Sequence, residues 1–108
     1  MSTATRPLLR HVVLFSFKDD ATPDQVDAIV AGFGALPDAI PGIVSYEWGT
    51  NVSPEGLHDG FTHCFTLGFA GDEERDAYLI HPAHQRFVGT LAGCLARSLV
   101  VDYWASQA

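Results

Sequence analysis

The 108-residue chain has the size of one ordinary domain, and its formal net charge is −7. Hydrophobic residues make up 47% of the chain and charged residues 18%. A chain of this composition can bury a hydrophobic core, so the composition excludes intrinsic disorder. The negative charge repels phosphate backbones, so we expect no nucleic-acid partner. No apolar run approaches the ~18 residues that span a bilayer, and the first residues lack the apolar core of a signal peptide. We therefore expect no membrane contact and a cytoplasmic location.

Apolar and polar side chains alternate in four segments, and this period of two predicts β-strands. The expected strands cover residues 9–17, 43–52, 61–69 and 98–104. The first strand is apolar on both faces, so both of its faces should be covered. Residues 1–8 are expected to form a flexible N-terminal tail, which leaves residues 9–105 as a single domain.

Three helices are expected between these strands. Thr22 and Gln25 can form a capping box around Pro23, which suits the first helical position. An apolar stripe continues this helix until Pro37 and Pro41 end it. The second helix opens with acidic side chains, which are favourable at a helix N-terminus. The second and third helices are expected over residues 72–80 and 84–92.

The order strand-helix-strand-strand-helix-strand predicts a ferredoxin-like α+β fold, with a four-stranded antiparallel sheet and helices on one face. This layout leaves the other face of the sheet bare. The first and fourth strands are neighbours in this topology, and their outer faces carry apolar residues. These residues are Val12, Leu14, Leu99, Val101 and Tyr103. A two-fold partner with the same face would bury them, so we expect a homodimer that completes a dimeric α/β barrel.

Histidines and one tyrosine are the best candidates for chemistry. His11 and His63 share strand faces with apolar side chains and should point toward the helices. His11 can equally be a hydrogen-bonded core histidine, and for His63 the core interpretation is favoured over the catalytic one. Tyr78, His81 and His84 are spaced by three, as on one helix face, but a proline interrupts the series. His81 also suits a helix C-terminus. His84 is therefore the strongest catalytic candidate.

Metal and nucleotide sites have little support in the sequence. His81 and His84 could bind a divalent ion together with Glu73 or Glu74, but those acids also suit a helix start. No HExxH, CxxC or glycine-rich phosphate loop is present, so we expect no metal and no cofactor. Cys64 and Cys94 are interpreted as buried thiols, and a bridge between them stays open at this stage.

Residues 76–87 contain the element Tyr-x-x-His-Pro-x-His at 78–84, and this segment resembles the signature of the stress-responsive dimeric α/β-barrel (Dabb) family. Further similar segments are residues 10–18, 46–49, 61–63 and 101–103. The resemblance covers roughly residues 9–104. It implies the same fold and the same homodimer as the strand pattern.

The best-understood activity in that family is polyketide cyclisation, in which a linear poly-β-keto chain closes a ring by aldol condensation without a cofactor. The resemblance implies that Tyr78 and His84 correspond to the catalytic residues. It also implies a substrate-binding pocket, formed by His11, Val13, Phe15, Ile29, Phe33, Tyr46, His63, His81 and Phe87. Phe33 stands where the cyclase has a tyrosine, so a different substrate is expected.

The leading hypothesis is a small cyclase or lyase for a polyketide-like or related aromatic substrate. His84 is its base, because imidazole has an ordinary pKa of ~6.5. Tyr78 binds the enolate oxygen, and His11 or His63 orients His84 or the substrate. The alternative is a non-catalytic, stress-responsive dimer that binds a small hydrophobic or aromatic ligand. A purely structural dimer is the third possibility.

Overall fold

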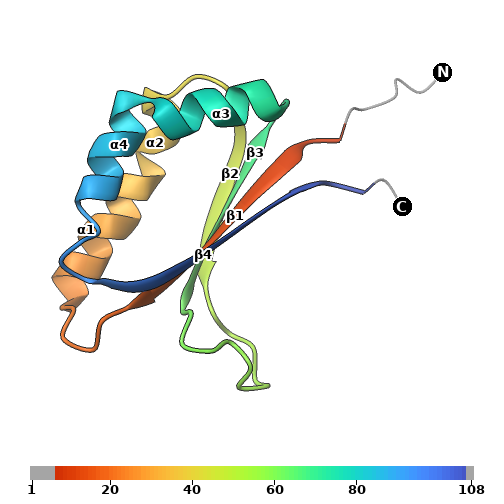
Figure 1. Cartoon of the computed structure of the whole chain (residues 1–108). Coiled ribbons are helices and arrows are strands. Elements are labelled where there is room, and N and C mark those ends of the chain that lie inside the picture. Colours follow the sequence, from red (N-terminus) through yellow and green to blue (C-terminus); the bar gives the residue numbers. More distant parts are fainter. Residues whose placement is uncertain (1–6, 107–108) are drawn as a thin grey trace.

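A four-stranded antiparallel sheet forms one layer of the protein, and its helices pack together on one face of that sheet (Figure 1). The computed structural model describes residues 7–106. The strands are β1 (Leu9–Phe17), β2 (Ile43–Thr50), β3 (His63–Phe69) and β4 (Leu95–Trp104). Their order across the sheet is β2-β3-β1-β4, so β1 and β3 are central and β4 is an edge strand. The predicted ferredoxin-like α+β fold is confirmed.

The helices are α1 (Pro23–Gly34), α2 (Leu36–Ala39), α3 (Asp72–Ile80) and α4 (Pro82–Gly89). The predicted capping box begins α1: Thr22 Oγ1 accepts the N–H of Gln25 at 3.2 Å, and Gln25 Oε1 accepts the N–H of Thr22 at 2.8 Å. Over residues 7–106, none of the helices combines the length and apolar character that crossing a membrane requires.

Two prolines act differently from the prediction. The first helix was expected to continue until Pro37, but α1 ends at Gly34 and Pro37 lies in the first turn of α2. An N–H is not needed at that position, so proline starts a helix there as readily as it ends one. Likewise, α4 begins at Pro82 rather than His84, because Nδ1 of His81 accepts the N–H of Ala83 at 3.0 Å and caps the helix.

The ends of three strands also differ from the expected ranges. The second strand stops at Thr50, the third begins at His63, and the fourth begins at Leu95. Of the predicted tail, residues 1–6 lie outside the described residues. The carbonyl of Leu8 accepts the N–H of Ala105 at 3.0 Å, so backbone pairing between the two ends of the domain begins one residue before β1.

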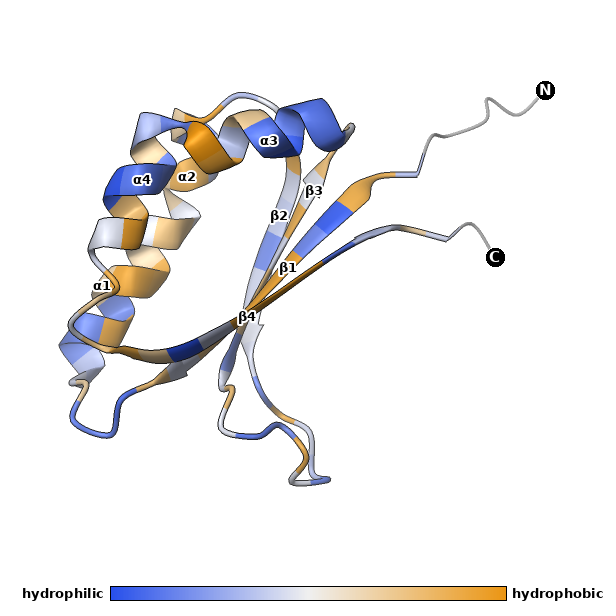
Figure 2. Cartoon of the chain, in the orientation of Figure 1, coloured by the Kyte–Doolittle hydropathy of each residue, from blue (hydrophilic) through white to orange (hydrophobic). Residues whose placement is uncertain are grey.

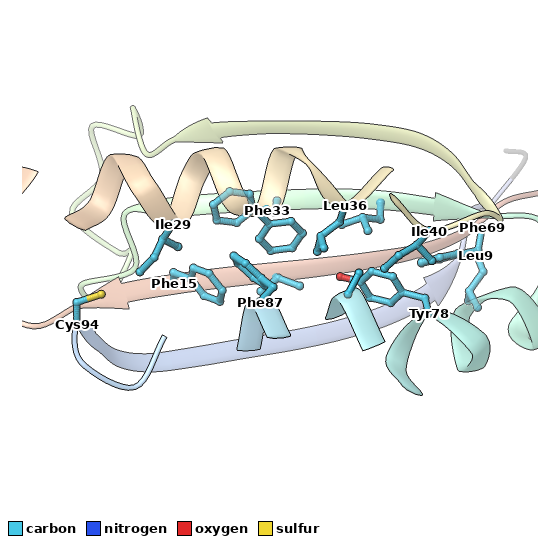
Figure 3. Close-up of a cluster of buried hydrophobic side chains, with 14 residues drawn as sticks. Leu9, Phe15, Ile29, Phe33, Leu36, Ile40, Phe69, Tyr78, Phe87 and Cys94 are labelled. Atoms are coloured by element: carbon cyan, nitrogen blue, oxygen red, sulfur yellow. The ribbon is translucent and has the colours of Figure 1, made fainter. Parts of the chain in front are cut away.

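The core lies between the sheet and the helices and is rich in aromatic rings (Figure 3). Phe33 on α1 is only 2% exposed, and its ring lies almost parallel to that of Phe65 at a centroid distance of 4.3 Å. The ring of Phe87 on α4 lies 5.0 Å from that of Phe33 and connects the two helices. Both thiols are free: Cys94 is buried, whereas Cys64 is only half-buried.

The opposite face of the sheet is apolar over β1 and β4. The strand register pairs Val12 with Val101 and Leu14 with Leu99, so these side chains share that face with Tyr103. We call Val12, Leu14, Leu99, Val101 and Tyr103 the open-face patch. No helix of residues 7–106 covers it, and Figure 2 shows the hydrophobic colouring of β4 beyond the helical layer. Leu99, Val101 and Tyr103 are about half exposed, as the sequence predicts for an uncovered face.

Candidate active site

A cavity of about 470 Å³ opens between the strands β1 and β4 and the helices α3 and α4. Its polar lining consists of His11, Tyr78, His84, Ser98 and Asp102. Its apolar lining consists of Val13, Phe15, Phe33, Leu79, Phe87, Val88, Leu91 and Val100. A mainly apolar wall with a few polar groups is typical of a small-molecule site. We call this space the helix-side cavity.

His84 lines this cavity and keeps one basic nitrogen without a hydrogen. Its Nδ1 lies 3.1 Å from the carbonyl oxygen of Leu79, which can only accept, so Nδ1 carries the hydrogen and Nε2 keeps its lone pair. Burial lowers the pKa of His84, the bond to Leu79 opposes this shift, and the neighbouring His11 adds to it. The ring is therefore largely neutral near pH 7 and can act as a base.

Tyr78 lies beside His84, with ring centroids 4.5 Å apart. It is 1% exposed, and Figure 3 shows its hydroxyl oxygen on the side of the ring that faces Phe87. Burial raises the pKa of Tyr78, and the nearby Tyr46 adds to this rise. The phenol therefore stays protonated and can donate a hydrogen bond to a negatively charged oxygen.

His11 belongs to the same wall and has a charged partner. Its ring is buried, lies edge-on to that of Tyr78 at 5.7 Å, and has Nδ1 2.7 Å from Oδ1 of Asp102. The strand register explains this contact, because it places His11 directly opposite Asp102. Oδ2 of Asp102 in turn accepts a hydrogen bond from Nη1 of Arg75 at 2.6 Å.

The profile of the stress-responsive A/B barrel domain, Dabb, matches residues 9–105. The chain belongs to the Dabb family. It is 38% identical over 103 residues to the stress-response A/B barrel domain-containing protein HS1 of Arabidopsis thaliana, covering 95% of this chain and 94% of that relative.

The chain is also similar to an enzyme and to a solved structure. Olivetolic acid cyclase of Cannabis sativa is 28% identical over 95 residues, which cover 88% of this chain and 94% of the cyclase. A crystal structure from Thermobifida fusca, described as a dimeric ferredoxin-like protein of unknown function, superimposes with a TM-score of 0.79 at 26% identity and covers 97% of each chain.

The helix-side cavity of this Dabb protein brings together seven of the predicted site residues. They are His11, Val13, Phe15, Phe33, Tyr78, His84 and Phe87. The other four predicted residues, Ile29, Tyr46, His63 and His81, do not line it. Their predicted part in substrate binding stays a prediction.

His63 lies at the other end of the sheet from His11. It points to the helix side, as the alternation predicts, but it is paired with Phe15, whereas His11 is paired with Leu67. Phe15 lies four positions after His11 on β1, which corresponds to roughly 13 Å along the strand. His63 stacks instead on Trp48 at 6.2 Å, and burial lowers its pKa.

The remaining three residues have packing or capping contacts. Ile29 is buried in the core, and His81 caps α4. Tyr46 stacks on Phe33 at 5.9 Å, and its buried hydroxyl has no hydrogen-bond partner within the part of the chain that the structure describes. Among residues 7–106, no three histidine, cysteine or acidic side chains gather in a way that could hold a metal ion.

A second hollow, of about 630 Å³, lies on the open face of the sheet beside the loop between β2 and β3. Leu14 and Leu99 of the open-face patch line it, together with the exposed residues Trp48 and His58. This hollow is larger than the helix-side cavity. Part of its wall, however, belongs to the open-face patch, which a two-fold partner would cover. We therefore place the candidate active site in the helix-side cavity, where a phenol and two buried or half-buried imidazoles meet.

Proposed function

We propose that this Dabb protein is a small cofactor-independent cyclase or lyase, acting on a linear poly-β-keto or related aromatic substrate. The observation that carries the proposal is the pairing of His84 with Tyr78: a neutral imidazole with a free Nε2 beside a phenol that stays protonated. The similarity to olivetolic acid cyclase supports the reaction class. The cavity volume of about 470 Å³ falls within the range of small-molecule sites.

Each group has a defined part in the proposed reaction. Nε2 of His84 removes a proton from the carbon between two carbonyl groups, and Tyr78 donates a hydrogen bond to the resulting enolate oxygen. The enolate carbon attacks a distant carbonyl carbon of the same chain, which forms the ring bond and an alkoxide. His84 returns its proton to that alkoxide. The apolar wall excludes water and folds the chain so that its ends meet.

The direct test supplies the purified protein with a polyketide synthase that releases linear tetraketides. Chromatography with mass detection measures the ring products. We expect the protein to raise the fraction of an aldol-type ring product over that formed spontaneously. An unchanged product distribution across tri- and tetraketides would argue against the cyclase function.

Binding without turnover is the second candidate function, and the apolar mouth of the cavity favours it. Leu79, Val88 and Val100 line the cavity and are also partly exposed, as in a site that admits a hydrophobic ligand. In that case, the product distribution stays the same while a hydrophobic or aromatic ligand binds in the cavity.

The activity should depend on pH through His84. Its base form is neutral, so the rate falls as the pH drops through the pKa of His84, which lies below the ordinary imidazole value of ~6.5. The raised pKa of Tyr78 predicts no loss of its donor hydroxyl below about pH 10. We therefore expect kcat/KM to be flat between about pH 7 and 9 and to decline only in acid. A decline whose midpoint lies above about pH 7 would contradict this assignment.

We further propose that the open-face patch is a homodimer interface. The structural neighbour from Thermobifida fusca is described as dimeric, and the patch is apolar and uncovered. Leu99→Lys places two charges in the proposed interface, so we expect it to convert dimers into monomers at micromolar concentration. Light scattering after gel filtration measures the change, with Ile80→Lys on exposed α3 as the control that stays dimeric. A monomeric wild type, or a dimeric Leu99→Lys, would contradict the interface.

A further inference from the structure

Arg75 on α3 reaches across the end of the helix-side cavity to the edge strand β4. Its Nη1 donates to Oδ2 of Asp102 at 2.6 Å, and its Nε donates to Oδ1 of Asp76 at 2.8 Å. The other oxygen of Asp102 lies 2.7 Å from Nδ1 of His11. A continuous chain of hydrogen bonds thus runs from the exposed Asp76 to a buried imidazole on the cavity wall.

This chain differs from an ordinary surface ion pair. The side chains of Arg75 and Asp102 are 22% and 23% exposed, and that of His11 is 6% exposed. The pair between Arg97 and Asp59, by contrast, is 50% and 79% exposed. A carboxylate beside an apolar cavity is costly without a compensating charge, and Arg75 supplies that charge.

We propose that Arg75 is a positioning residue for His11. By holding Oδ2 of Asp102, it fixes Oδ1 as the acceptor for the Nδ1–H of His11. The ring then stays in one tautomer and one orientation, with Nε2 as the nitrogen available to the cavity. The guanidinium suits this task, because its donors have a rigid geometry and Asp76 holds its other edge.

The result is that two imidazoles with the same hydrogen-bonding pattern lie beside Tyr78. Each has its Nδ1 hydrogen held by an acceptor: the carbonyl of Leu79 for His84, and the carboxylate of Asp102 for His11. Their rings lie 4.5 Å and 5.7 Å from that of Tyr78.

A catalytic use of Nε2 of His11 rests on the proposed function. A ring closure that ends in loss of water removes two carbon-bound protons. The first leaves its electron pair in the new C–C bond, and the second leaves its pair in a C=C bond as hydroxide departs and takes up a proton. Two imidazoles with free Nε2 atoms can accept these two protons in turn. We assign His84 to the first proton and His11 to the second.

The competing explanation is that Arg75 only ties α3 to β4. Loss of the tie then lowers the unfolding temperature and leaves the state of the His11 ring unchanged. The state of the ring therefore separates the two explanations, and it is measurable without any substrate.

Nuclear magnetic resonance of the full chain with nitrogen-15-labelled histidine tests the inference. In the wild type we expect a single His11 tautomer and a far-downfield proton signal coupled to Nδ1. In Arg75→Gln we expect that proton signal to be lost and the ring nitrogen shifts to move toward the average of two tautomers. Arg75→Lys should restore part of the signal, and the exposed control Arg97→Gln should match the wild type.

Asp76→Ala provides a second variant, because Asp76 is exposed and the substitution removes the acceptor of only one edge of Arg75. We expect a shift in the same direction as in Arg75→Gln, but smaller. Wild-type His11 ring shifts in both Arg75→Gln and Asp76→Ala would overturn the inference, whatever happens to stability. The same holds if Arg75→Gln fails to fold and Asp76→Ala alone shows wild-type shifts.

A kinetic measurement adds the functional consequence. With a substrate that the wild-type protein converts, Arg75→Gln should lower kcat about tenfold, as is typical when a group that orients a functional histidine is lost. We expect KM to change less than about twofold and Arg75→Lys to recover part of the rate. A wild type that turns over no polyketide would count against the proposed function, whereas unchanged ring shifts would count against the role of Arg75, so the two failures are distinguishable.

Discussion

Replacement of His84 by glutamine is expected to lower kcat by about 100- to 10,000-fold, the usual contribution of a general base. Glutamine keeps a polar side chain of similar reach, but it has no nitrogen that accepts a proton at neutral pH. The carbonyl of Leu79 keeps a second donor in Nε2 of Gln85, so the loss of the His84 bond does not leave it unpaired. The decrease should therefore be catalytic rather than structural, and single-turnover kinetics measures it.

Two variants complete this experiment. His58→Gln, in the exposed loop between β2 and β3, is the same substitution away from the cavity and should keep the wild-type rate. Tyr78→Phe removes only the hydroxyl and keeps the ring packed, and the loss of one oxyanion donor predicts a decrease of about 100- to 1,000-fold. A His84→Gln variant with the rate of His58→Gln would show that the cavity does not use an imidazole base.

The second large effect concerns stability, and it is expected at Phe33. Phe33→Ala should lower the free energy of unfolding by about 3–5 kcal/mol, because the ring is almost fully buried and its removal leaves a cavity among other aromatic rings. Denaturation by urea at a fixed protein concentration measures this difference, since association would otherwise shift the midpoint.

The control for this measurement is Val52→Ala, at a position that is 89% exposed. A change within about 0.5 kcal/mol is expected there. A loss of less than about 1 kcal/mol for Phe33→Ala would contradict the packing of α1 and α4 through this ring.

Local patterns in the sequence predicted the elements well where the cause is local. The alternation of side chains predicted β1 with its observed ends, and the capping box at Thr22 predicted the start of α1. The predicted start of α4 was wrong. A histidine directly before a proline can cap the helix that follows, and the proline then begins that helix rather than breaking it. Here His81 provides that cap.

The polar half of the candidate site depends on information that local patterns do not contain. Asp102 shares the helix-side face of β4 with Val100, but only the register between β1 and β4 places it beside His11. The register between β1 and β3 places His63 at the far end of the sheet from His11. Alternation predicts the face of a strand on which a residue lies, but not its position along the neighbouring strand.

Arg75 is the clearest residue that sequence analysis missed. It stands in an acidic first turn, and a charge there suggests a solvated helix surface. Its partner Asp102 is 27 residues away, and the contact exists because α3 packs on β1, whose neighbour β4 carries Asp102. Tyr78 and His84, in contrast, are close in sequence, so their proximity in the cavity was predictable.

The central claim is that the helix-side cavity, rather than the hollow on the open face, binds the substrate. Benzoylacetone, a neutral aromatic diketone whose enol resembles the proposed enolate, tests this directly when added to labelled protein during nuclear magnetic resonance. We predict saturable shifts of the His11, Tyr78 and His84 side-chain signals, with the Leu99 methyl and His58 ring signals unchanged. Shifts confined to Leu99 and His58, with the three cavity residues unmoved, would contradict the assignment of the site.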